Sequence, residues 1–275
     1  MQDLKVTLVQ TDTLWQNPKR NRDMLSRTID KLNDPTDLVV LPEMFSTGFT
    51  IDSVANAESM DGDSIKWMHE TASKYDVVIS GSLIIKEQER YYNRFIWMPP
   101  DGKYISYDKR HLFRMANEHE HYVAGRKRVV VTLNGWRISP MVCYDLRFPV
   151  WCRNNNDDDD YYDVLIFVAN WPAKRRYAWQ TLLKARAIEN LCYVVGVNRV
   201  GRDENNLDYA GDSVAINFLG EVLATCENET RLTTVNFNYE QLKNYRHDFP
   251  AHKDADQFTL RGKIVVGSYD VVLFA

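Results

Sequence analysis

The sequence predicts an α/β protein with a mixed sheet whose two faces are both covered. Short apolar runs typical of buried strands alternate along the chain with segments of helical periodicity. Connections through helices, typical of parallel strands, are mixed with tight hairpin signals, so the sheet should contain both kinds of strand pair. No repeat, linker or change of composition divides residues 1–275, and we therefore expect one domain.

The first half of the chain contains strand–helix units followed by a hairpin. Four apolar runs are expected to be buried strands: Lys5–Gln10, Leu38–Leu41, Val77–Gly81 and Leu83–Ile85. Two segments have helical periodicity: Pro18–Leu32, with proline at its start, and Ser64–Tyr75. Tyr91–Met98 and Tyr104–Tyr107 flank Pro99-Pro100-Asp101-Gly102, a turn sequence that predicts a hairpin.

The second half begins with another predicted hairpin and then returns to alternation. Val129–Leu133 and Trp136–Val142 flank Asn134-Gly135, which suits a type I′ turn. A helix is expected directly after Cys143. The later expected elements are the helix Ala173–Glu189 and the strands Val164–Val168, Tyr193–Asn198, Asp212–Asn217 and Glu221–Thr225. The polar run Asn154–Asp160 should be a solvated surface loop, because its adjacent carboxylates repel one another.

Composition argues against several classes of function. The net charge is −4 and no long Lys/Arg run occurs, so neither nucleic acid nor an anionic membrane is an expected partner. The start Met1–Gln10 is typical of a strand rather than a signal peptide, and no apolar run approaches the ~18 residues of a membrane helix. Four scattered cysteines without a Cys-x-x-Cys pair fit a reducing cytoplasm. We therefore expect a soluble cytoplasmic protein.

One dense group of potential metal ligands occurs, His119-Glu120-His121. Histidines two residues apart share a face only on a strand, and no matching Cys/His pair follows. We expect neither a metal nor another cofactor.

Three reactive side chains each follow a strand-like apolar run: Glu43, Lys109 and Cys143. Loops at one set of strand ends line the ligand crevice of an α/β sheet, so the three could meet there. The helix expected behind Cys143 would direct its N–H groups and dipole at the sulfur, which favours the thiolate and a neighbouring oxyanion. The alternative is that Cys143 is a buried small hydrophobe and that Glu43 and Lys109 are solvated charges.

Together the three groups make a coherent nucleophilic site. A thiol needs a base, a carboxylate can be that base, and an ammonium can stabilise both the thiolate and the charge that develops on a carbonyl oxygen. Serine-hydrolase chemistry is not expected, because the Gly-x-Ser-x-Gly turn is absent from the sequence.

Six segments carry a resemblance that covers nearly the whole chain: Leu41-Pro42-Glu43, Asp108–Phe113, Val142–Pro149, Ala169-Asn170-Trp171-Pro172, Arg186–Asn190 and Gly211-Asp212-Ser213. In this order they resemble the signatures of the carbon–nitrogen hydrolase (nitrilase) superfamily. Within it, the chain is most similar to the ω-amidase branch, whose members hydrolyse 2-oxoglutaramate and 2-oxosuccinamate.

The resemblance implies a four-layer αββα sandwich, a catalytic triad of Glu43, Lys109 and Cys143, and a thioester intermediate. It also implies a homodimer and a second active-site glutamate after the lysine segment. Glu118 and Glu120 are both candidates for that glutamate, and we favour Glu118. The oxyanion would be held by Lys109 and the backbone N–H of Tyr144.

An ω-amide substrate carries a carboxylate, so its pocket should supply a cation. The candidate cations near the motifs are Arg114, Arg147, Lys174, Arg175 and Arg176. The alternative for Arg147 is a structural pair with Asp145. The candidate aromatic walls are Phe45, Phe113, Tyr144, Trp171 and Trp179, each of which could instead be core packing.

Other functions remain open at this point. A nitrilase or an N-carbamoyl amide hydrolase would use the same triad, and only substrate profiling would separate them. A non-catalytic binding module could keep the fold, although the presence of all three reactive residues argues against it. A glutaminase half of a synthetase would require an ATP-binding domain, and the sequence contains no P-loop.

Overall fold

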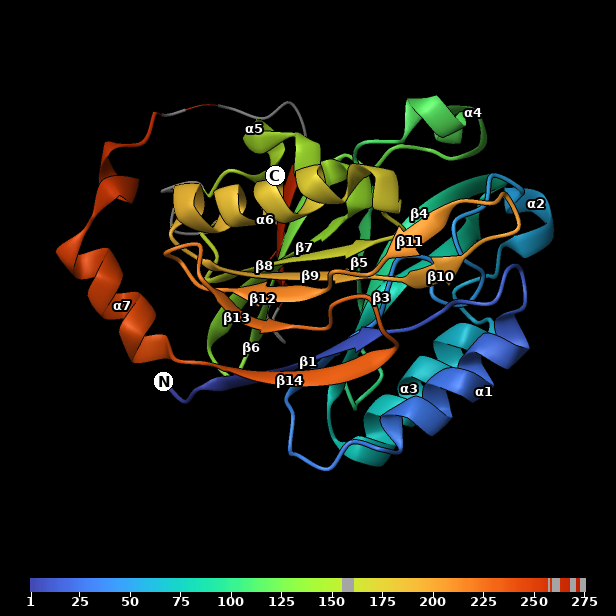
Figure 1. The fold of residues 1–275 in the computed structure, drawn as a ribbon, viewed down its shortest axis with the longest axis horizontal. Helices are drawn as coiled ribbons and strands as arrows, with labels where there is room; N and C mark the ends of the chain where they lie inside the picture. Colours follow the sequence, from blue (N-terminus) through green and yellow to red (C-terminus); the bar gives the residue numbers. More distant parts are fainter. Residues whose placement is uncertain (155–160, 257, 259–262, 268–270, 273–275) are drawn as a thin grey trace.

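The computed structural model describes residues 1–154, 161–256, 258, 263–267 and 271–272 (Figure 1). Most of the predicted surface loop Asn154–Asp160 therefore lies outside the described residues. Its first residue, Asn154, is buried rather than solvated. The Asn154 side chain is bound to the backbone of Tyr162 and Asn190, so this residue belongs to the folded framework.

Two large mixed sheets replace the one sheet that the strand pattern predicted. The first has the order β14-β1-β2-β3-β4-β5, and β1, β2 and β3 are parallel neighbours. Its strands are β1 (Leu4–Gln10), β2 (Leu38–Val40), β3 (Val78–Glu87), β4 (Arg90–Met98), β5 (Ile105–Asp108) and β14 (Arg231–Phe237). The expected strands at Val77–Gly81 and Leu83–Ile85 are one continuous strand, β3, and the predicted hairpin is β4–β5.

The second sheet has the order β13-β12-β9-β8-β7-β6-β15-β16, with β7, β8 and β9 parallel. Its strands are β6 (Lys127–Leu133), β7 (Trp136–Val142), β8 (Val164–Ala169), β9 (Tyr193–Asn198), β12 (Val214–Ile216), β13 (Val222–Thr225), β15 (Lys263–Gly267) and β16 (Val271–Val272). The type I′ turn predicted between β6 and β7 is confirmed, since Asn134 and Gly135 both have positive φ (51° and 88°). A separate hairpin joins β10 (Val200–Arg202) and β11 (Asp208–Ala210).

Helices cover the outer faces of the two sheets, which completes the four-layer αββα sandwich (Figure 1). Helices α1 (Pro18–Ile29) and α3 (Asp63–Tyr75) pack on the first sheet. Helix α6 (Arg176–Asn190) packs on the second. Shorter helices connect the strands: α2 (Ser53–Asn56), α4 (Glu118–His121) and α5 (Pro149–Cys152), and α7 (Tyr239–Asp248) follows β14. No helix in the described part of the chain is both long and apolar enough to cross a bilayer.

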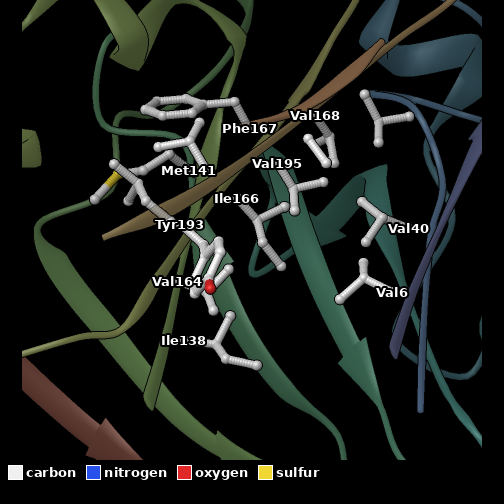
Figure 2. Close-up of a cluster of buried hydrophobic side chains, with 14 of the residues drawn as sticks. Val6, Val40, Ile138, Met141, Val164, Ile166, Phe167, Val168, Tyr193 and Val195 are labelled. Atoms are coloured by element: carbon white, nitrogen blue, oxygen red, sulfur yellow. The ribbon is translucent and has the colours of Figure 1, made fainter. Parts of the chain in front are cut away.

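The strand periodicity explains how the layers are held together. In β2, Leu38 and Val40 belong to the core between the sheets, whereas the intervening Val39 packs toward the helices. Figure 2 shows Val40 beside Val6 of β1, facing the apolar side chains of the second sheet. Strands buried on both faces need apolar residues at every position, and the segment Val164–Ala169 of β8 has them.

The helix expected directly after Cys143 is only partly correct. The chain forms a short 3₁₀ helix, η2 (Cys143–Arg147), and then the single turn α5. Cys143 itself has a left-handed backbone (φ 46°), which interrupts helical geometry at its first residue. The segment therefore lacks the aligned peptide dipoles of a regular helix.

Candidate active site

Three strand ends bring Glu43, Lys109 and Cys143 together, as their positions after apolar runs predicted. Glu43 follows β2, Lys109 directly follows β5, and Cys143 directly follows β7. The Lys109 Nζ lies 2.9 Å from Glu43 Oε1, and both side chains are fully buried. The charges of Glu43 and Lys109 both act on the Cys143 thiol, and Lys109 and Cys143 share the lining of one cavity.

Glu43 is oriented by two asparagines. Asn93 of β4 donates its side-chain N–H to Glu43 Oε1 at 2.7 Å. Asn170 lies just after β8, and its backbone N–H donates to Glu43 Oε2 at 2.7 Å. The side-chain amide of Asn170 donates to the backbone carbonyl of Glu43, also at 2.7 Å. Both carboxylate oxygens are thereby fixed, and Asn93 is a site residue that the sequence analysis did not find.

Glu118, and not Glu120, lies beside the lysine. Its two oxygens are 3.0 and 2.9 Å from Lys109 Nζ, and its side chain is fully buried. Its carboxylate also accepts the backbone N–H of Phe113 at 2.5 Å and the Asn93 amide at 3.2 Å. The Glu120 side chain is 62% exposed. One ammonium is therefore enclosed by two buried carboxylates.

Burial and charge set the protonation of this cluster. Burial by itself lowers the pKa of the Lys109 ammonium, but the charges of Glu118 and Glu43 outweigh it and hold that pKa well above the usual value. Burial raises the pKa of Glu118, and Lys109 offsets this only in part because Glu43 adds like-charge repulsion. Lys109 is thus a permanent cation at neutral pH.

The turn that carries Cys143 is held by a buried carboxylate. Asp145 accepts the backbone N–H of Val142 at 3.1 Å, the Tyr107 hydroxyl at 2.7 Å and the backbone N–H of His111 at 2.9 Å. Tyr107 and His111 flank the lysine segment in sequence. Asp145 therefore holds the turn of Cys143 against the segment that carries Lys109. The alternative interpretation of Arg147 was a structural pair with Asp145, but the oxygens of Asp145 are bonded to these other residues.

The expectation of a stabilised resting thiolate is wrong. Burial raises the pKa of the Cys143 thiol well above its ordinary value, the negative charge of Glu43 raises it further, and Lys109 lowers it only in part. The short η2 helix supplies too little dipole to reverse this. Cys143 rests as a neutral thiol, so a base would have to remove its proton before the sulfur could act as a nucleophile.

This protonation state can be measured directly. We expect the thiolate absorbance of the wild-type protein, minus that of Cys143→Ser, to stay near zero through neutral pH and up to about the ordinary thiol pKa of ~8.5. A thiolate signal that titrates below pH 7 would contradict a resting neutral thiol.

The cavity in front of Cys143 has a volume of about 190 Å³. Arg147 borders it, and so do three of the five candidate aromatic walls, Phe113, Tyr144 and Trp171. For Phe45 and Trp179 the alternative interpretation, core packing, is the correct one. Phe45 packs in the core beneath α3, and Trp179 of α6 donates its indole N–H to the Asp212 carbonyl. Walls that the sequence analysis did not predict come from Phe49 and from the β10–β11 hairpin through Leu207 and Tyr209.

The five candidate cations separate into two groups. Arg147, Lys174 and Arg175 border the cavity, and the Arg147 guanidinium lies 4.9 Å from the centre of the Trp171 ring. Arg176 is paired with Asp212 at 2.7 Å, and Arg114 is an exposed residue of a 3₁₀ turn outside the cavity lining. Three of the five positions are thus available to a bound anion.

Comparison with known proteins identifies the family. Residues 5–247 match the family model described as carbon-nitrogen hydrolase. The chain belongs to this carbon–nitrogen hydrolase family. It is 46% identical to the omega-amidase YafV of Yersinia enterocolitica over 264 residues, which cover 94% of this chain and all of that protein. It is 31% identical to the 2-oxoglutaramate amidase of Bacillus subtilis, over 90% of this chain and 96% of that one.

The carbon–nitrogen hydrolase fold is also seen in solved structures. A superfamily protein from Xanthomonas campestris, solved with an arsenic adduct in its active site, superposes with a TM-score of 0.92 at 46% identity. The match covers 94% of this chain and all of that one. The yeast Nit3 structure, at 22% identity and a TM-score of 0.76, shares the fold. The resemblance identified from the six sequence segments is therefore confirmed.

Proposed function

We propose that this carbon–nitrogen hydrolase is an ω-amidase, which releases ammonia from the terminal amide of a short substrate that also carries a carboxylate. The observation that carries the proposal is the buried contact of Lys109 with Glu43 and Glu118 behind a cavity bordered by Cys143. The similarity to an ω-amidase and to a 2-oxoglutaramate amidase supports 2-oxoglutaramate as the substrate. 2-Oxosuccinamate, which the resemblance to the ω-amidase branch implies, is the second candidate.

In the first half-reaction, the Cys143 sulfur attacks the amide carbonyl and Glu43 takes the thiol proton. Glu43 suits this role because its oxygens are held by Asn93 and Asn170 and because the resting thiol is neutral. The tetrahedral oxyanion is stabilised by the Lys109 ammonium and by the backbone N–H of Tyr144. Removing one such donor typically costs about 3 kcal/mol of transition-state stabilisation.

The intermediate collapses when ammonia leaves with a proton from Glu43, and Cys143 then carries the acyl group as a thioester. Glu43 next deprotonates a water molecule, which attacks the thioester and releases the carboxylic acid and the thiol. Glu118 holds the Lys109 ammonium in place through both steps. No metal or cofactor is needed for this sequence of proton transfers.

The cavity favours a small anionic substrate. Its volume of about 190 Å³ is below the ~300–1,000 Å³ of pockets that bind drug-sized ligands. Arg147, Lys174 and Arg175 border it, and their positive charge complements a carboxylate. A simple nitrile or an apolar amide would leave this charge unused.

The proposal is tested by ammonia release from a substrate panel. We expect kcat/KM for 2-oxoglutaramate to exceed that for glutamine, asparagine, simple nitriles and ureido acids by at least about 10-fold, because each alternative lacks either the keto-acid end or the amide. Highest activity on nitriles would instead indicate a nitrilase, and highest activity on ureido acids an N-carbamoyl hydrolase.

We also propose that the chain acts as one domain in the cytoplasm and forms a homodimer. The shared core that spans both sheets supports one domain, and four free cysteines support a reducing compartment. The apolar stripe of Leu182–Leu191 supplies intrachain core through Leu183 and Ala187. The exposed Tyr177 and Ile188 remain available on α6 for a second subunit, which sedimentation velocity can test.

A further inference from the structure

We propose that Arg175 is the residue that binds the substrate carboxylate and that it sets the preference for anionic over neutral amides. This inference rests on the proposed amidase function and selects one of the three cations that border the cavity. It assigns the recognition to a guanidinium already fixed in place before a substrate arrives.

The cavity carries uncompensated positive charge. Within the described residues, no carboxylate forms an ion pair with Arg147, Lys174 or Arg175, although all three border the cavity. The adjacent Arg176, by contrast, is bound to Asp212 through two hydrogen bonds of 2.7 and 3.1 Å. Like charges gathered at a concave, largely apolar surface repel one another and attract an anion. A bound substrate carboxylate would therefore neutralise part of the positive charge of these three side chains.

Arg175 is the best prepared of the three cations. Its backbone is fixed, because its N–H donates to the Pro172 carbonyl at 2.9 Å and its carbonyl accepts the Trp171 indole N–H at 2.9 Å. Its guanidinium lies 5.4 Å from the centre of the Phe113 ring. Arg175 as a whole is half-buried, and a guanidinium held over an aromatic face loses little further side-chain freedom on binding.

The hydrogen bond that Arg175 makes now is one that a substrate can easily replace. Its Nη2 donates to the Met115 sulfur at 2.8 Å. A thioether sulfur is a weak acceptor, whereas a carboxylate offers two charged oxygens that match the guanidinium fork. Arg147 is exposed above Trp171, and Lys174 is an exposed point charge without a fork. A substrate carboxylate should therefore bind more tightly to Arg175 than to Arg147 or Lys174.

The loop after β5, which contains Phe113 and Met115, connects this anchor to Lys109. Phe113, beneath the guanidinium, donates its backbone N–H to Glu118, which in turn holds Lys109. The carboxylate anchor and the oxyanion-stabilising ammonium are therefore connected through two residues, Phe113 and Glu118. The separation between the two cations selects substrates in which the carboxylate and the amide lie at a set distance.

The test compares two amides of equal length that differ only in charge, glutaramate and its diamide glutaramide. Arg175→Gln should lower kcat/KM for glutaramate by roughly 30-fold, the loss expected for a charge-assisted hydrogen bond, and for glutaramide by less than about 3-fold. Arg175→Lys, which keeps the charge without the fork, should fall between. The matched control Arg176→Gln should leave the ratio of the two activities unchanged.

Glutarate binding to the Cys143→Ala protein, measured by calorimetry, gives a readout independent of turnover. We expect Arg175→Gln to weaken this binding by roughly 30-fold as well. Equal losses on both amides, an unchanged ratio, or glutarate binding that does not depend on Arg175 would overturn the assignment. A wild-type protein that hydrolyses neither amide yet binds glutarate through Arg175 would contradict the proposed function and keep the anion site.

Discussion

Cys143→Ala is expected to lower kcat by at least about 10⁴-fold while leaving the fold intact, because it removes the atom that forms the thioester. Cys143 lies at the edge of the core and is only partly buried, so the loss of one sulfur should change the free energy of unfolding little. The measurement is ammonia release from 2-oxoglutaramate at saturating substrate. The unchanged far-UV circular dichroism of the variant would show that the loss is chemical.

A second thiol provides the control for this experiment. Cys226 is a buried residue whose sulfur lies 3.3 Å from the Thr233 hydroxyl, and it does not border the cavity. Cys226→Ser can keep that hydrogen bond and should retain near wild-type kcat.

During turnover, mass spectrometry of the quenched wild-type protein should detect an acyl adduct on the peptide that contains Cys143. A Cys143→Ala protein with wild-type activity would end the proposed mechanism.

The sequence was sufficient to predict that Glu43, Lys109 and Cys143 lie at one site, for a physical reason. Glu43, Lys109 and Cys143 each follow a short apolar run, and strand ends are the positions at which a sheet exposes side chains to a crevice. This information is local, because it depends on residues adjacent in the chain. The separation of the three residues along the chain did not matter once each strand was recognised.

Asn93 was missed because its role depends on strand register. It lies within β4, opposite Ile84 of β3, where a polar residue faces either the reaction centre or the outer side. A shift of one residue in the pairing exchanges the two faces, and the sequence does not state that register. One signal in the sequence could have identified Asn93. Phe95 and Trp97, two and four residues later on the same face of the strand, belong to the core, so a polar amide on that face is unusual.

The strand pattern alone did not reveal the second sheet, which only the family resemblance implied, and the protonation state of the thiol was missed for a related reason. Strand patterns show which faces are apolar but not which strands are neighbours, and the pairing of β1 with β14 joins Leu4 to Phe237. The pKa of the Cys143 thiol likewise depends on burial and on Glu43, which are consequences of the tertiary fold. The sequence analysis considered only the helix dipole, which favours the thiolate. Burial and the charge of Glu43, which favour the thiol, are the stronger effects.

Lys109→Met is expected both to abolish turnover and to destabilise the protein, because it removes the one ammonium between two buried carboxylates. Glu43 and Glu118 would face each other without a cation at about 0% exposure. Removing one partner of a buried ion pair typically costs about 3–5 kcal/mol of unfolding free energy. Urea denaturation at neutral pH measures this loss, and ammonia release measures the loss of activity.

The destabilisation of Lys109→Met should also depend on pH with a defined sign. Burial and the charge of Glu43 already raise the pKa of Glu118 in the presence of Lys109, and without the ammonium this pKa must rise further. A carboxyl whose folded-state pKa exceeds its unfolded value of ~4.3 stabilises the fold at low pH and loses that contribution as the pH rises through the folded-state pKa. The variant should therefore recover stability relative to the wild type as the pH falls from neutral toward the unfolded-state value of ~4.3.

A second substitution separates the charge effect on folding from the role of Lys109 in catalysis. In Lys109→Met combined with Glu118→Gln, only the carboxylate of Glu43 remains, and Asn93 and Asn170 still bind it. This double variant should regain much of the unfolding free energy and lose most of the pH dependence, yet remain inactive because the oxyanion lacks its cation. An active double variant would show that Lys109 serves only to balance the buried charges. A Lys109→Met protein as stable as the wild type at neutral pH would show that the two carboxylates do not need the ammonium between them.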